Sequence, residues 1–186
     1  MAARMKPTRV GLAAIVVAAL LAGCGIGANS SAVAPSSPTA SQAPAGVTDA
    51  VAQTRGAIAG ALTSAGVGAQ FGDANQPYRP AESPRLRDAP RVVYQVVLPD
   101  EPDAGFVVVY EFPDTASAVN AGNEEAGYLG TGPARVQFPP DAEHVLQAVG
   151  TTLVLYTWSP TASSDPTAGN VADALARLGV GFSVPR

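Results

Sequence analysis

The sequence predicts an α+β domain: an antiparallel sheet of four to five strands built from two hairpins, with helices mainly on one face. Two pairs of short segments rich in β-branched and aromatic residues are each joined by a turn. Apolar residues at helical spacing flank these pairs and lie between residues that cap or end helices. The expected order of elements is α-β-β-α-β-β-β-α.

The first helix is expected to begin after Thr48, whose hydroxyl can cap it, and to end at Gly66. The first hairpin pairs residues 91–98 with residues 106–112. The loop between them, residues 99–105, is rich in Pro, Asp and Gly, which favour turns. The apolar stripe of the first helix contains Val51, Ile58, Leu62 and Ala65.

Asp114 can cap a second helix that runs to about Leu129. A short strand is expected over residues 134–138, followed by the second hairpin, residues 144–149 and 152–158. Asp165-Pro166 then begins the last helix, with Asp as the cap and Pro at the first helical position, and Gly179 ends it. Residues 108–117 are similar to residues 154–163, which supports two hairpin-then-helix units.

The N-terminal 23 residues have the pattern of a secretory signal peptide. Arg4, Lys6 and Arg9 precede an uninterrupted apolar run over residues 10–21. As a helix this run would span about 18 Å, less than the ~30 Å hydrocarbon core of a membrane. We therefore expect an export signal and no permanent membrane span.

The sequence Leu21-Ala22-Gly23-Cys24 resembles the lipobox of bacterial lipoproteins. The resemblance implies cleavage before Cys24 and acylation of its thiol, so that membrane lipid is the first partner and the protein is anchored to the cell membrane on its extracytoplasmic side. Two acyl chains hold a protein far better than one. The alternative is an ordinary cleaved signal with an incidental cysteine. The folded region also resembles small uncharacterised lipoproteins of GC-rich bacteria, which implies no activity and no site residues.

Residues 24–46 are expected to be the lipidated Cys and a flexible tether, and residues 47–186 a single domain. Ala, Ser, Pro or Gly occupy 17 of the 22 positions from 25 to 46, and none is charged or aromatic. Such a segment cannot bury enough apolar surface to offset its conformational entropy. Without the signal peptide the chain has eight arginines against 15 acidic residues, a net charge of −7.

This composition excludes several classes of function. The acidic balance argues against a nucleic-acid partner, which requires a basic face. One Cys and one His cannot form a Cys/His zinc site, and the carboxylates of residues 100–103 lack the calcium-loop pattern, so no metal or cofactor is expected. The only His, His144, lies in an expected strand and is interpreted as a strand-surface residue. We therefore expect no catalytic residues and no enzyme.

Two candidate binding regions remain. The first is the long connection over residues 67–91, whose arginines could grip an anionic ligand because guanidinium matches carboxylate and phosphate. The alternative is that they pair with acids of the chain itself. The arginines are Arg79, Arg85, Arg87 and Arg91.

The second candidate is an aromatic sheet face. Alternation along the strands places Tyr110 and Phe112 on one face, and Tyr156 and Trp158 on the corresponding face of the second hairpin. An exposed patch of this kind would mark a protein interface. The alternative is that the long connection or a helix covers it.

The sequence thus predicts a lipoprotein with a non-catalytic binding or accessory domain that contacts an envelope protein through the aromatic face. A carrier or sensor of a small ligand, using the arginine-rich connection, is the alternative. A carboxylate-dependent hydrolase acting on envelope polymers is the third hypothesis, and it requires two acids about 5–10 Å apart in a cleft.

Overall fold

The computed structural model describes residues 48–186. Cys24, the expected signal peptide and the expected tether lie outside the described residues. In chain order the elements are α1 Asp49–Ser64, β1 Gln70–Asp73, α2 Pro84–Asp88, β2 Arg91–Val97, β3 Phe106–Glu111, α3 Thr115–Gly130, α4 Gly132–Arg135, β4 Glu143–Val149, β5 Thr152–Trp158, α5 Thr167–Leu175 and β6 Val180–Gly181.

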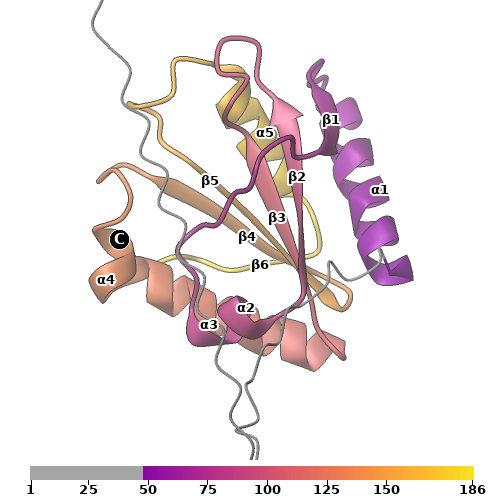
Figure 1. The fold of residues 1–186 in the computed structure, drawn as a ribbon, viewed down its shortest axis with the longest axis vertical. Helices are drawn as coiled ribbons and strands as arrows, with labels where there is room; N and C mark the ends of the chain where they lie inside the picture. The colour runs from indigo at the N-terminus through magenta and orange to yellow at the C-terminus, as the bar shows by residue number, and fades with distance from the viewer. Residues whose placement is uncertain (1–47) are drawn as a thin grey trace, which may run out of the picture. The chain divides into compact units, whose positions relative to one another are not determined.

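The strands form one six-stranded antiparallel sheet in the order β1-β2-β3-β5-β4-β6 (Figure 1). The α+β class and the antiparallel sheet are therefore confirmed, as are the two hairpins, β2–β3 and β4–β5. The sheet has six strands where four to five were expected, because the short strands β1 and β6 extend its two edges.

The helices cover both faces of the sheet, so the expectation that they lie mainly on one face is wrong. α1 and α5 pack on one face, and α2 and α3 pack on the other (Figure 1). The central strand β3 explains this arrangement: Val107 and Val109 point to the first face, whereas Val108 and Tyr110 point to the second. A strand that is apolar on both sides requires cover on both sides.

Two of the three predicted helix starts, those capped by Thr48 and Asp114, are confirmed by their hydrogen bonds. The Thr48 hydroxyl accepts from the amide of Val51, and the Asp114 carboxylate accepts from the amide of Ser117 at 2.7 Å. Each bond satisfies an amide that has no partner within its helix.

The last helix begins at Thr167 with Pro166 in the cap position, one residue later than predicted. Gly66 and Gly179 have positive φ angles of 71° and 45°. Gly66 directly follows the C-cap of α1, whereas α5 ends at Leu175, four residues before Gly179, so the predicted end of the last helix is wrong.

Three short elements were not predicted, and one was predicted wrongly. β1, α2 and β6 have only four, five and two residues, which is too short for a periodic pattern. The expected strand over residues 134–138 is instead helix α4 followed by a turn. Pro at the start of this segment favours a helical first turn, and Val136 remains 83% exposed.

Candidate functional site

The four aromatic residues predicted to share one face lie on opposite faces of the sheet. In the register between β3 and β5, Tyr110 is opposite Leu153, whereas Tyr156 is opposite Val107. Residues directly opposite each other point to the same side, so Tyr110 and Tyr156 point to different sides. Each tyrosine packs with the helix that follows its own strand, and those helices cover different faces.

These aromatic side chains form no exposed patch. Tyr110 and Tyr156 are 0% and 1% exposed, and Phe112 is also buried. Trp158 is half-buried and lies against Gly169 of α5. The hypothesis of an aromatic protein-binding face is therefore wrong, and cover within the chain, the alternative, is what the structure shows.

The arginine-rich connection is also engaged within the chain. Arg79 donates to Glu82 at 2.8 Å, and Arg91 forms an ion pair with the same carboxylate. Arg85 pairs with Glu124 of α3 at 3.0 Å. Three of the four predicted arginines therefore pair with acids of the chain itself, which was the alternative to ligand binding.

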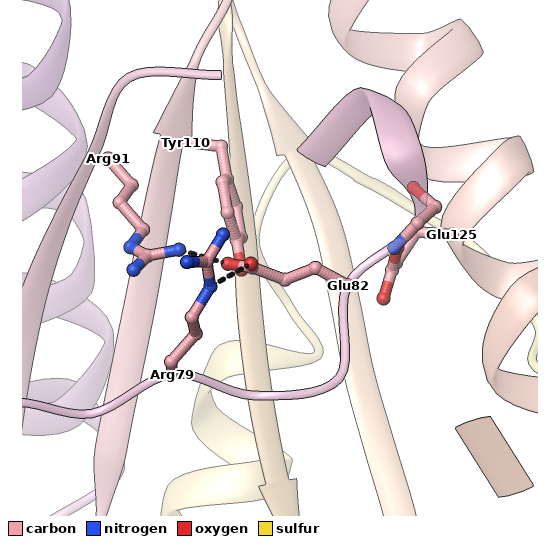
Figure 2. A network of polar contacts seen from close by, with 6 residues as sticks. Arg79, Glu82, Arg91, Tyr110 and Glu125 are labelled. Atoms are coloured by element: carbon pink, nitrogen blue, oxygen red, sulfur yellow. Dashed lines mark hydrogen bonds and ion pairs between the residues drawn. The ribbon is translucent and has the colours of Figure 1, made fainter. Parts of the chain in front are cut away.

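Figure 2 shows how Arg79, Arg91 and Tyr110 converge on Glu82. The Glu82 side chain is only 2% exposed, and it also accepts a hydrogen bond from the Tyr110 hydroxyl at 2.9 Å. Burial, reinforced by the Glu82 charge, raises the pKa of Tyr110, so its hydroxyl stays protonated and keeps donating. Two of the predicted candidates, Arg79 and Arg91, therefore neutralise a buried carboxylate, and a third, Tyr110, donates a hydrogen bond to it. Arg87 makes no ion pair within residues 48–186.

A second buried carboxylate lies next to this network. Glu125 of α3 is 0% exposed, and its Oε2 accepts from the amide of Ser83 at 2.8 Å. Its Oε1 has no hydrogen-bond partner among the described residues. Burial raises the pKa of Glu125, and the hydrogen bond from Ser83 opposes this shift. This contact fastens the strap segment, residues 74–83, to α3, and we assign it a structural role.

A pocket of about 460 Å³ lies where the C-terminal segment meets α3, α4 and the start of β4. We call it the C-terminal pocket. Phe182 and Pro185 form one wall by lying against two glycines of α3. A Cβ on Gly122 would come within 2.4 Å of Phe182, and a Cβ on Gly130 would come within 2.8 Å of Pro185. The pocket is lined by Leu129, Arg135, Phe138, Pro139, Pro140, Asp141, Ala142, Glu143, His144, Pro160, Phe182, Ser183, Val184, Pro185 and Arg186.

His144 lies in this pocket in a fixed orientation. Its Nδ1 lies 2.9 Å from the Thr157 hydroxyl, and the imidazole and the Phe138 ring form a T-shaped pair with their centres 4.9 Å apart. Burial lowers the pKa of His144, which favours the neutral ring. Because Nδ1 is engaged, Nε2 is the ring atom left for a further hydrogen bond.

The acids of the pocket are held by other groups. Asp141 accepts hydrogen bonds from the Ser159 hydroxyl and from the amide of Thr161. Both bonds lower the pKa of the Asp141 carboxyl, and the bond from Thr161 has the larger effect. Glu143 pairs with Arg186 at 3.1 Å. Arg135 makes no ion pair with the described part of the chain.

A smaller cavity, about 200 Å³, lies beside the β2–β3 hairpin loop and is lined in part by Tyr156 and Trp158. Glu101 closes its rim by accepting from the Ser163 hydroxyl at 2.7 Å and from the amide of Ser164 at 2.6 Å. The hydrogen bond from the Ser163 hydroxyl is the main cause of a lowered pKa at Glu101. The volume of this smaller cavity lies below the ~300–1,000 Å³ of usual ligand pockets. We therefore regard the C-terminal pocket as the candidate site.

Neither Glu82 nor the C-terminal pocket was predicted from the sequence. Glu82 is the only acid between Arg79 and Arg87, a signal that could have identified it as their partner. The C-terminal pocket had no comparable signal, because its walls come from the loop before β4 and from residues 182–186, which are distant in sequence.

The described residues include no helix long and apolar enough to cross a membrane. Residues 48–186 also hold no group of three or more His, Asp or Glu side chains placed to bind a metal ion. In comparisons with protein-family models, with curated proteins and with solved structures, no match to this chain was found.

Proposed function

We propose that this chain is a lipid-anchored extracytoplasmic protein whose domain is a non-catalytic binding module with the C-terminal pocket as its ligand site. The lipobox-like sequence ending at Cys24 supports the anchor and the location. The pocket is the observation that carries the binding role, because its volume of about 460 Å³ lies within the range of small-molecule sites.

The chemistry of the pocket supports binding over catalysis. A glycoside hydrolase of the usual kind requires one protonated acid and one carboxylate that is free to act. Asp141 has a lowered pKa and accepts two hydrogen bonds, and Glu143 is in an ion pair. His144 is hydrogen-bonded to a threonine, so no carboxylate orients it as a catalytic base.

Photo-crosslinking in cells of the native host tests this proposal. Ser183 is exposed and lines the pocket, whereas Ser64 is exposed at the end of α1, which packs on the other face of the sheet. We expect p-benzoylphenylalanine at Ser183 to give a covalent adduct after irradiation, seen as a mass shift on a denaturing gel, and the same group at Ser64 to give none.

Paired arginine variants make the result specific. Arg135→Gln should weaken the Ser183 adduct because Arg135 lines the pocket, and Arg87→Gln should leave it unchanged. Equal adducts at Ser183 and Ser64, or no adduct at Ser183, would refute the binding role.

A further inference from the structure

The charges of the C-terminal pocket balance each other. Arg135 and Arg186 are matched by Asp141 and Glu143, and burial favours the neutral form of His144. A site for a strongly charged ligand carries an excess of the opposite sign, which raises the local concentration of that ligand. This pocket has no such excess, so its lining favours an uncharged ligand.

The pocket also offers hydrogen-bond donors and acceptors side by side. Guanidinium groups donate only and carboxylates accept only, and both line the same space, with the Ser183 hydroxyl able to do either. A ligand rich in hydroxyl groups uses such a mixture fully, because each hydroxyl donates and accepts at once. Amide groups on the ligand would use it in the same way.

Two aromatic rings add an apolar surface to this polar lining. Phe138 and Phe182 line the pocket, and both are half-buried. The C–H face of a pyranose ring is apolar and flat, and it packs on an aromatic ring while its hydroxyls point to polar neighbours. The exposed residues Pro139, Pro140 and Arg186 show that the pocket opens to solvent, so the end of a polymer can enter.

From these features we infer that the C-terminal pocket binds an uncharged saccharide, such as the N-acetylated sugar units of an envelope polymer. The inference rests on the proposed function and names its ligand class. Glu143 and Arg135 contact hydroxyl or acetamido groups, and Phe138 and Phe182 pack against sugar rings.

Isothermal titration calorimetry on the purified full chain tests the inference, in a detergent without a sugar headgroup. The probe is tri-N-acetylchitotriose, compared with the peptide acetyl-Ala-Pro-Ala-Pro-amide and with citrate. We expect saturable binding of the saccharide alone. Raising sodium chloride from 50 to 500 mM should change the affinity less than twofold, because an uncharged ligand is not screened by salt.

A matched pair of variants ties the binding to the pocket. Glu143 and Glu124 each form an exposed ion pair with an arginine, but only Glu143 lines the pocket. Glu143→Gln should weaken saccharide binding at least tenfold, and Glu124→Gln should leave it unchanged. Circular dichroism should show both variants folded.

Three outcomes would overturn the inference: no saturable binding of the saccharide, equal binding by the Glu143→Gln variant, or binding of the peptide or citrate in its place. If the Ser183 adduct forms in cells while the saccharide does not bind, the ligand class is wrong and the binding role stands. If neither is observed, both proposals fail.

Discussion

Glu82 is the residue on which a buried polar network of the domain depends. Its carboxylate is almost fully buried and is contacted by Arg79, Arg91 and Tyr110. A buried charge is stable only while its partners remain, and removing one member leaves the others without compensation. Arg79 and Arg91 therefore serve the fold, which explains why an arginine-rich segment can be a poor guide to a ligand site.

Replacing Glu82 should test this role directly. Glu82→Gln keeps the shape of the side chain but removes its charge, so Arg91, 25% exposed, loses its ionic partner. We expect the free energy of unfolding to fall by about 3 kcal/mol, measured by urea denaturation. Glu124→Gln removes an exposed ion pair and should change it by less than about 1 kcal/mol. Equal losses in the two variants would contradict the assignment.

Among the elements, the contact between the strap segment and α3 has an unusual chemistry. The amide of Ser83 donates to Glu125, whose second oxygen is buried without a partner. Burial disfavours the ionised form, so the folded protein holds the Glu125 proton more tightly than the unfolded chain. The stability that this proton confers is fully present below the ordinary pKa of 4.5 and is lost as pH rises through the raised value.

Glu125→Gln should remove this dependence. The variant cannot ionise, so its free energy of unfolding relative to the wild type should increase as pH rises from 4.5 to 8. Urea denaturation at a series of pH values measures this difference. Glu124→Gln, one residue earlier on the same helix, removes a charge that also raises the pKa of Glu125, so it should give a smaller increase of the same sign. A pH-independent difference for Glu125→Gln would show that its carboxyl ionises normally.

Elements with a local signal were predicted well, and those that depend on distant partners were not. Thr48 and Asp114 identified helix starts because a cap is formed within three residues of sequence. The prediction of a shared aromatic face was wrong because it depends on the register between β3 and β5. Tyr110 and Tyr156 would share a face only if the pairing of these strands shifted by one residue. The C-terminal pocket was missed for the same reason, since its walls meet only after the whole chain has folded.

For the whole molecule, the proposed anchor sets where the domain can act. If residues 25–46 form the tether that their composition predicts, a coil of this length would span about 25 Å, and an acylated Cys24 would hold the domain close to the membrane. A ligand site on a domain held in this way would meet envelope polymers near the membrane surface.

Changing the acceptor cysteine tests the anchor. Cys24→Ser has no thiol to acylate, so the protein should leave the membrane fraction or remain unprocessed, as measured by cell fractionation and by the mass of the product. Ser36→Ala, within the expected tether, should behave as the wild type does. A processed Cys24→Ser protein that stays with the membrane would contradict the lipobox interpretation.

The position of Phe182 and Pro185 against the glycines of α3 also decides when the pocket comes into existence. A chain is synthesised from its N-terminus, and these two residues follow every helix and strand of residues 48–186. The surface of α3 that carries Gly122 and Gly130 is therefore synthesised before the two residues that cover it. Until residues 182–185 have been made, this surface has no cover from the C-terminal segment, and the proposed ligand pocket cannot form.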